Sequence, residues 1–284
     1  SKHDKDLSIP YLGDFANIPS LLKNNDLDGV IVSFSHKEHD LILPVIQQTE
    51  GKNIEIFYVP DILDILTSNF NNLEVNGLPL LQLKSFMLSG WQGFIKRGFD
   101  IIISALALIV LSPLFFIIAL LIILTSPGPV FYRQKRVTLD DEDFEMLKFR
   151  SMYVTETSKE GLIDVVRNDP RITPVGKFLR RTSADELPQL WNVLKGYMSL
   201  VGPRPERRYY VELNKKEIPR YSERHRVRTG ITGWAQVNGL RQQDSMLVER
   251  IRYDLYYIEN WSLAFDIKII LMTIMVIVRG ENAY

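Results

Sequence analysis

Two adjacent carboxylates, Asp185 and Glu186, are the residues of this chain best suited to covalent chemistry. Pro188 follows them closely, and proline is typical of the first turn of a helix. A helix N-terminus binds phosphate and keeps a carboxylate ionised, and an ionised Asp attacks phosphorus to form an aspartyl phosphate. Asp185 and Glu186 are also candidate ligands of Mg²⁺, which takes oxygen ligands and bridges to substrate phosphates. The pair therefore indicates phosphoryl transfer.

The same stretch, residues 182–196, also has a purely structural explanation. Ser183 and Glu186 match a capping box, and Gly196 is a helix stop. Asp185 and Glu186 would then only complement the positive end of the helix. Taken alone, the motif favours this explanation. The apolar face of the predicted helix consists of Leu187, Leu190, Trp191 and Leu194.

Transfer from a diphosphate also needs cations around the phosphates. Arginine suits this task because its guanidinium group contacts phosphate through two hydrogen bonds. Spacing alone does not rank the candidates, which are Arg180, Arg181, Arg204, Arg220, Arg224, Arg226 and Arg228.

A long uncharged run, Ile101–Leu124, is the element that must place this chemistry. It is long enough to cross about 30 Å of hydrocarbon, but Pro113 should kink or break the helix at its middle. Basic residues flank both ends, which favours a helix that enters and leaves the membrane on one side. An ordinary kinked transmembrane helix is the alternative. The flanking cations are Lys96, Arg97, Arg133, Lys135 and Arg136.

The remaining patterns divide the chain near residue 90. The first 90 residues are acidic, and strands at 29–34, 54–59 and 78–83 with a helix at 38–48 predict part of an α/β unit with a parallel sheet. The rest is basic, which suits anionic lipid or phosphorylated ligands. It contains a predicted hairpin of strands 130–133 and 144–150, and a predicted helical tail, 253–278. Residues 269–278 are expected in the protein core, with the membrane interface as the alternative. The chain has no Cys, which excludes disulfides and thiolate metal sites.

Eight motifs in order make residues 91–284 resemble the bacterial polyprenyl-phosphate glycosyl-1-phosphate transferases of the monotopic type. Together they are far more specific than any one of them. They are 96–100 (KRGFD), Ser112-Pro113, 126–132 (SPGPVFY), 148–152 (KFRSM), 185–189 (DELPQ), 200–206 (LVGPRPE), 230–237 (GITGWAQV) and 260–263 (NWSL).

The resemblance implies a ping-pong reaction. Asp185 would be the nucleophile that forms a phosphosugar enzyme and releases UMP from a UDP-sugar, after which polyprenyl phosphate takes the phosphosugar. Glu186 would assist Mg²⁺ binding or proton handling. The residues that match positions used around phosphates are Lys148, Arg180, Arg204 and Arg241.

The fold that the resemblance implies has two parts. Residues 1–90 would be a partial Rossmann-like α/β domain and linker, and residues 91–284 a mainly helical α+β monotopic membrane catalytic domain. Its re-entrant helix, about 94–124, would be broken at Ser112-Pro113. The expected location is the cytoplasmic face of the bacterial inner membrane. The expected partners are a UDP-sugar, undecaprenyl phosphate, membrane lipid and a second copy of the chain, with no nucleic acid.

The C-terminal residues 280–284 and the run 253–263 look most like members that transfer glucose-1-phosphate to undecaprenyl phosphate and so initiate exopolysaccharide, capsule or O-antigen synthesis. Gln242-Gln243 departs from that subgroup, where a Gly-Glu pair is common. Two alternatives remain at this point: a catalytically inactive membrane scaffold for glycan assembly, and a metal-dependent phosphohydrolase.

Overall fold

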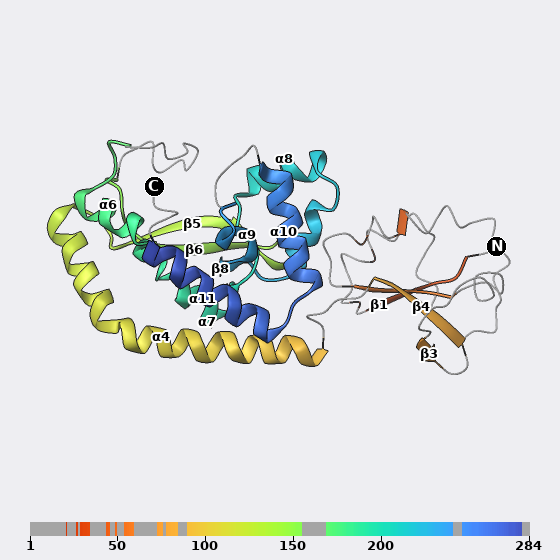
Figure 1. Ribbon diagram of the computed structural model, residues 1–284. Helices are drawn as coiled ribbons and strands as arrows, with labels where there is room; N and C mark the ends of the chain where they lie inside the picture. Colours follow the sequence, from red (N-terminus) through yellow and green to blue (C-terminus); the bar gives the residue numbers. More distant parts are fainter. Residues whose placement is uncertain are drawn as a thin grey trace. The chain divides into compact units, whose positions relative to one another are not determined.

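The computed structural model describes residues 90–154, 169–240 and 246–279, together with short pieces of the first 84 residues (21, 27, 29–34, 44–45, 49, 54–59, 73–75 and 78–84). The chain divides into two compact units, Ser1–Phe86 and Met87–Tyr284. Figure 1 shows the elements of both.

The first unit contains a four-stranded sheet. Its strands are β1 (Gly29–Val32), β2 (Glu55–Tyr58), β3 (Leu73–Val75) and β4 (Leu78–Lys84), in the order β1-β2-β4-β3. β1 and β2 are parallel, as predicted, but β4 runs antiparallel to β2 and forms a hairpin with β3, so the sheet is mixed. Val32, Val45 and Ile56 form its buried cluster. Most of the helix predicted over 38–48 lies outside the described residues.

The second unit begins with the long helix α4 (Gly90–Thr125), which buries three polar side chains in its first half. Lys96, Asp100 and Ser104 are spaced by four, share one face of the helix and are buried. The ammonium of Lys96 lies 2.9 Å from Asp100 and 2.7 Å from Asp266, and the Ser199 hydroxyl donates to Asp100 at 2.8 Å. These contacts fix the first half of α4 to the rest of the unit.

Most apolar side chains of α4 point outward instead. Ile109, Val110, Phe116 and Leu124 are each at least 70% exposed. Among the described residues, this is the one helix long and apolar enough to cross a membrane, with a mean hydropathy of 3.1 over its most apolar window. A large exposed apolar surface of this kind marks a site that contacts lipid or another protein.

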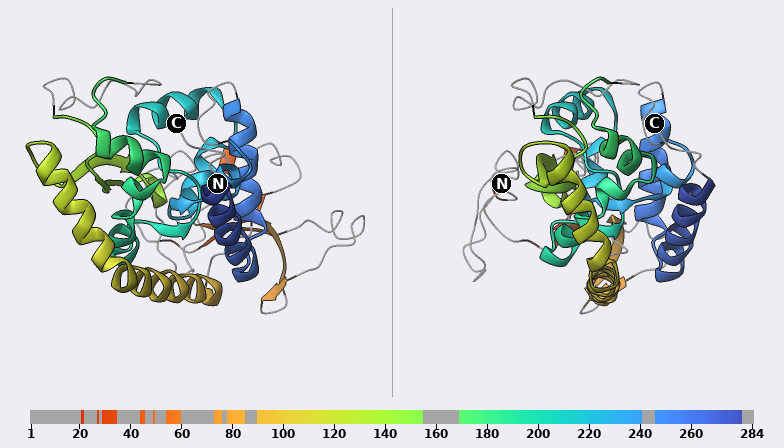
Figure 2. Two further views of the ribbon diagram at one scale, coloured as in Figure 1. Left: turned by 60° about the vertical axis from the view of Figure 1, so that its left-hand side comes forward. Right: turned by 90° about the vertical axis from the view of Figure 1, so that its left-hand side faces the viewer.

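Pro113 bends α4 without dividing it into two helices (Figures 1 and 2). Proline lacks the N–H that would bond to the carbonyl of Ile109, and the Ser112 hydroxyl donates to that carbonyl at 2.8 Å instead. The expected break at Ser112-Pro113 is therefore a bend in one continuous helix. Re-entry into the membrane stays a prediction.

A β-hairpin follows α4. β5 (Phe131–Val137) pairs with β6 (Asp143–Phe149) in antiparallel register from Phe131 opposite Phe149 to Val137 opposite Asp143. The turn η3 (Leu139–Asp141) has positive φ at Asp140 and Asp141, which Asp tolerates better than most residues. The predicted hairpin is confirmed, with a longer first strand. Phe149 packs with Ile118, Ile122 and Leu179, which joins the hairpin to the second half of α4.

The rest of the unit consists of short elements around a two-stranded parallel pair, β7 and β8. The predicted helical tail is two helices, α10 and α11. The elements in order are α6 (Pro174–Arg181), η4 (Ala184–Glu186), α7 (Gln189–Lys195), β7 (Ser199–Val201), α8 (Arg208–Glu217), η5 (Tyr221–Arg226), β8 (Gly230–Thr232), α9 (Trp234–Val237), α10 (Leu247–Glu259) and α11 (Leu263–Arg279).

Helix α11 does not fill the core, so the prediction for residues 269–278 is wrong. Its buried residues are Asp266 and Ile269, whereas Leu271, Ile274 and Val278 are more than half exposed. The reason is that α11 packs one side against α9, β7 and β8, and an apolar pattern does not reveal how many sides of a helix are covered.

Candidate active site

Asp185 and Glu186 lie on η4, a single 3₁₀ turn between α6 and α7, and both are buried. Helix α6 begins at a Thr173 cap whose hydroxyl accepts from the Gly176 N–H at 2.8 Å. A Cβ on Gly176 would lie 1.9 Å from the carbonyl oxygen of Ser151. Only glycine allows this close approach, which sets the position of α6 and of the turn that follows it.

The capping box expected at Ser183 and Glu186 is absent. Ser183 has φ 55° and makes no side-chain capping hydrogen bond, because an N-cap needs the extended conformation. Trp191, expected on the buried face, is half exposed. The helix stop at Gly196 is confirmed by its φ of 89°. The buried residues of α7 are Gln189, Leu190, Asn192 and Val193.

Two cations from distant segments meet at Glu186. The ammonium of Lys148 on β6 lies 2.8 Å from Glu186 Oε1, and the Arg204 guanidinium lies 3.6 Å from the same oxygen. Buried Asn192 of α7 holds β6 beside η4, since its amide donates to Glu145 and accepts from the Leu147 N–H. The structure thus brings together Asp185, Glu186, Lys148 and Arg204.

The other predicted phosphate-binding residues are placed differently. Arg180, on α6, donates to the Ser151 hydroxyl at 2.9 Å and to the sulfur of Met152 at 3.2 Å, and its charge helps to lower the pKa of Asp169. Arg241 lies outside the described residues. Ser112 and Pro113 lie in the exposed part of α4.

Two glycines let the loop after β7 that carries Arg204 pack against β8. A Cβ on Gly202 would lie 2.4 Å from the carbonyl oxygen of Arg228, and one on Gly230 would lie 2.1 Å from the Gly202 nitrogen. Gly202 and Gly230 bond across the pair to Thr232 and Pro203, each at 2.9 Å. This packing fixes the backbone immediately before Arg204.

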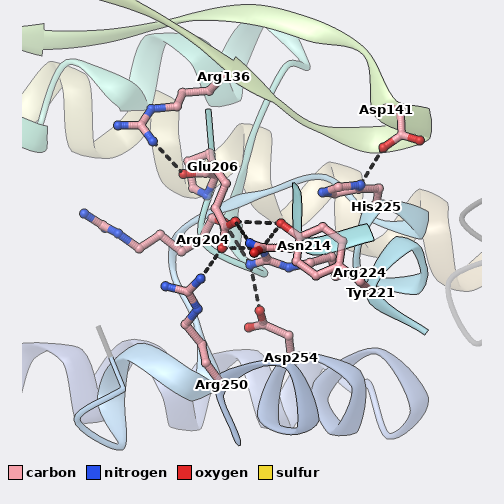
Figure 3. A network of polar contacts seen from close by, with 11 residues as sticks. Arg136, Asp141, Arg204, Glu206, Asn214, Tyr221, Arg224, His225, Arg250 and Asp254 are labelled. Carbon is pink, nitrogen blue, oxygen red and sulfur yellow. Dashed lines mark hydrogen bonds and ion pairs between the residues drawn. The ribbon is translucent and has the colours of Figure 1, made fainter. Parts of the chain in front are cut away.

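A buried network of ions fixes the backbone after Arg204 (Figure 3). Arg224 donates to Glu206 at 2.6 Å, to Asp254 at 2.8 Å and to the Arg204 carbonyl at 3.0 Å. Arg250 also pairs with Glu206, and the Tyr221 hydroxyl donates to Glu206 at 2.6 Å. Each carboxylate therefore has a partner, as buried charges require.

The electrostatics of Glu206 follow from this arrangement. Burial by itself would raise the pKa of Glu206, but Arg224, Arg250 and the Tyr221 hydrogen bond outweigh it and lower the pKa to about 2. Burial and the neighbouring carboxylate raise the pKa of Tyr221 to about 12. Glu206 is thus a permanent anion that holds the Arg204 segment in place.

Most arginines of the basic cluster proposed from sequence have structural partners. Arg224 binds Glu206 and Asp254, Arg226 binds Glu223 at 2.7 Å, and Arg220 binds Glu259 at 2.5 Å. Arg228 donates to the Gly196 carbonyl at 2.7 Å. Each of these four residues thus has a structural use, and phosphate binding by any of them stays a prediction. Sequence reasoning missed Glu206, Asp254 and Arg250 as parts of this network, and the Pro-Arg-Pro-Glu run at 203–206 was a signal for Glu206 alone.

The donor set at η4 fits Mg²⁺ of the substrate-bound kind. Such sites use one or two carboxylates, and substrate phosphates and water complete the shell. Asp185 and Glu186 supply two carboxylates next to the cations that a diphosphate would need. Within the part of the chain that the structure describes, no cluster of three or more His, Cys, Asp or Glu residues forms a cage for a metal. A metal bound here would need ligands from the substrate.

Comparison with known proteins identifies relatives of the whole second unit. A family model described as "Bacterial sugar transferase" matches residues 91–280. The UDP-glucose:undecaprenyl-phosphate glucose-1-phosphate transferase of Xanthomonas campestris pv. campestris is 40% identical over 97% of this chain and 58% of its own length. The corresponding enzyme of Escherichia coli (strain K12) is 38% identical over 98% of this chain and 60% of its own length.

Relatives with other printed names match as well. A UDP-N-acetylgalactosamine-undecaprenyl-phosphate N-acetylgalactosaminephosphotransferase of Aeromonas hydrophila is 42% identical over 81% of this chain and 54% of its own length. The chain spans about three fifths of the length of the first curated relatives it matches.

Proposed function

The chain belongs to the bacterial sugar transferase family, and on this premise we propose that it transfers a sugar 1-phosphate from a UDP-sugar to undecaprenyl phosphate or another polyprenyl phosphate, with release of UMP. The observation that carries the proposal is the meeting of Asp185 and Glu186 on one buried turn with Lys148 and Arg204 from distant segments. Two carboxylates and two cations at one point suit a nucleophile attacking a diphosphate.

In the first half-reaction, an oxygen of Asp185 attacks the phosphorus that carries the sugar. The bond between that phosphorus and the bridging oxygen breaks, and UMP leaves with the bridging oxygen and its electron pair. In the second, a phosphate oxygen of the polyprenyl phosphate attacks the same phosphorus, and the bond to Asp185 breaks. The carboxylate is regenerated, and neither half-reaction requires a net proton transfer.

Lys148 and Arg204 have two tasks in this scheme. Without substrate they neutralise Glu186, which is buried. With substrate they lie where negative charge accumulates on the phosphoryl oxygens, and cations placed there stabilise the transition state of phosphoryl transfer. Arg180 lies near the end of α6, five residues before Asp185 in the chain, and we propose that it binds phosphate when substrate replaces its weak contact with Met152.

Asp185 and Glu186 are the residues that would hold Mg²⁺ with the diphosphate. When bound, the ion neutralises phosphate charge and orients the leaving group. Glu186 is the carboxylate better able to change its position when the ion binds. Its two cationic partners, Lys148 and Arg204, have long side chains and can move with it.

Helix α4 supports a membrane location for the reaction. Its polar face is fixed to the catalytic unit through Lys96 and Asp100, and its apolar face is exposed. We propose that it enters the cytoplasmic leaflet of the inner membrane and returns at the Pro113 bend. A soluble nucleotide sugar and a lipid phosphate would then meet at the membrane surface. The homodimer implied by the resemblance is part of this proposal.

Glucose is the sugar we propose. Two relatives that align with nearly the whole chain are named for glucose-1-phosphate transfer. Relatives that align with less of it are named for N-acetylgalactosamine and galactose, so the donor test includes those sugars.

The test is UMP release by the full chain in detergent or lipid nanodiscs, with Mg²⁺, undecaprenyl phosphate and each UDP-sugar in turn. Asp185→Asn should lower turnover by at least about 10³-fold, the scale typical of a lost catalytic group, and should abolish a covalent adduct of protein and sugar phosphate. Asp143→Asn is the matched control, because Asp143 is an exposed carboxylate in a surface ion pair.

Three results would contradict the proposal. Full turnover in Asp185→Asn would exclude the covalent mechanism. Absence of UMP with every UDP-sugar would favour the catalytically inactive scaffold. Free sugar phosphate released equally fast with and without lipid would favour a phosphohydrolase.

A further inference from the structure

Arg136 is a cation without a carboxylate partner in the part of the chain that the structure describes. It lies near the end of β5, where its guanidinium donates to the Gln134 side-chain oxygen at 2.7 Å and to the Pro205 carbonyl at 3.4 Å. Both acceptors are neutral. Its Nε is buried and makes no hydrogen bond with the described residues. Buried Arg224 has two carboxylates beside it, whereas buried Arg150 donates to carbonyl and hydroxyl oxygens that cap the end of α4.

The charges around Arg136 make its position costly for the protein alone. Burial lowers the pKa of Arg136 to about 10, and the neighbouring charges of Arg204 and Arg207 act in the same direction. Glu206 opposes them, but it already accepts from Arg224, Arg250 and Tyr221. Arg136 is only partly buried, but a cation held beside two other cations is costly unless an anion offsets them, so this site has an excess of positive charge.

This excess lies directly beside the candidate active site. The Pro205 carbonyl that Arg136 contacts belongs to the residue after Arg204, and the Arg204 guanidinium reaches Glu186. Figure 3 shows the guanidinium groups of Arg136 and Arg204 extending to the same side of the network. Lys148 and Arg204 meet at Glu186, and the charge of Arg204 in turn acts on Arg136, so the three cations are neighbours in this order.

We propose that Arg136 binds a second substrate phosphate, next to the one that Asp185 attacks. The inference rests on the proposed function, because it needs a diphosphate or its products in the site. A phosphate presents several acceptor oxygens, and arginine binds it through two parallel hydrogen bonds. Two phosphates of different origin have this chemistry: the one that leaves with UMP and the one at the end of the incoming polyprenyl chain.

The test compares Arg136→Gln and Arg136→Lys with the wild-type chain. Arg133→Gln is the matched control, because Arg133 is on the same strand but exposed, with Glu145 at 3.3 Å. KM and kcat are measured separately for UDP-glucose and for undecaprenyl phosphate, together with inhibition by UMP. Arg136→Gln should raise at least one KM about tenfold or more, Arg136→Lys should raise it less, and the control should leave both within twofold.

The two substrate arms distinguish the origins of the phosphate. A raised KM for UDP-glucose with weaker inhibition by UMP assigns Arg136 to the leaving phosphate, and a raised KM for undecaprenyl phosphate assigns it to the acceptor. If both KM values and the inhibition by UMP stay within twofold of wild type, the inference is wrong while the proposed function stands. If the wild-type chain releases no UMP from any UDP-sugar, the proposed function is wrong and this inference fails with it.

A stability measurement separates phosphate binding from a structural role. Arg136→Met removes an uncompensated, partly buried cation, so without ligand its melting temperature should equal or exceed that of the wild type. UMP with Mg²⁺ and undecaprenyl phosphate are tested separately, and at least one of them should raise the melting temperature of the wild type and not that of the variant. A variant that melts several degrees lower without ligand, yet responds to both ligands like the wild type, would show that Arg136 only supports the fold.

Discussion

Replacing Arg224 by Met removes the central cation of the network behind Arg204. Its guanidinium is 1% exposed and bonds to Glu206 at 2.6 Å, to Asp254 at 2.8 Å and to the Arg204 carbonyl at 3.0 Å. Methionine fills much of the same volume without charge. The variant would leave two buried carboxylates, with Arg250 remaining as a cation beside Glu206.

Two independent routes give the size of the effect. Removing one partner of a buried ion pair costs about 3–5 kcal/mol, because the other charge stays buried. The pKa of Glu206 falls from its ordinary 4.5 to about 2 in the fold, and at about 1.4 kcal/mol per pKa unit this corresponds to roughly 3 kcal/mol of stabilisation, of which Arg224 supplies a part beside Arg250 and Tyr221. For a unit of this size, about 3–5 kcal/mol lowers the melting temperature by roughly 10 °C.

The assay is thermal unfolding of the full chain in detergent at pH 7, followed by tryptophan fluorescence. Arg220→Met is the control, since the pair of Arg220 with Glu259 is at least half exposed and such pairs contribute about 1 kcal/mol or less. A melting temperature of Arg224→Met within about 2 °C of the control would refute the reasoning.

The pH dependence has a definite sign. Because the pKa of Glu206 is lower in the folded chain than in the unfolded one, its charge stabilises the fold fully above about pH 4.5, and this contribution is lost as the pH falls toward about 2. In Arg224→Met both Glu206 and Asp254 lose the cation that lowers their pKa, so they are protonated at a higher pH than in the wild type. The difference in melting temperature should therefore be largest near pH 7 and shrink as the pH falls. A difference unchanged down to pH 3 would show that the charge of Glu206 is not its cause.

Two further perturbations test the placement of the site. Gly176→Ala puts a Cβ 1.9 Å from the Ser151 carbonyl oxygen, so it should displace α6 and η4 and lower UMP release at least about tenfold. Gly98→Ala, whose Cβ would meet nothing within 4 Å, should leave it unchanged. The chain has no Cys, so single cysteines at Trp91 and Lys135 report topology directly. Both should react from the cytoplasmic side, and labelling from opposite sides would show that α4 spans the membrane.

Local patterns predicted the elements that depend on neighbouring residues. The hairpin of β5 and β6 was predictable because strand-forming runs flank a turn-forming Asp cluster. The end of α7 was predictable because Gly196 takes a positive φ that other residues avoid. The bend of α4 followed from the missing N–H of Pro113, although the Ser112 hydrogen bond that keeps the helix continuous did not.

Two expectations failed because they depended on how the segment packs in the fold. Ser183 fitted a capping box by spacing, but its φ of 55° excludes that role. Residues 269–278 fitted a core segment by composition, but α11 has an exposed apolar side. The local sequence allowed either outcome in both cases, and tertiary packing determined the backbone of Ser183 and the burial of α11.

The sequence by itself determined the chemistry that is possible here. The adjacent carboxylates Asp185 and Glu186, the uncharged run with its central proline and the ordered motifs were all readable without a structure. Only the tertiary structure decided which cations serve that chemistry. An arginine's charge is used by whichever carboxylate the fold brings to it, so Arg224 stabilises the fold while Arg204 reaches Glu186. Spacing alone did not single out Arg136, which the fold leaves without a carboxylate partner within the described residues and which we propose as a phosphate ligand.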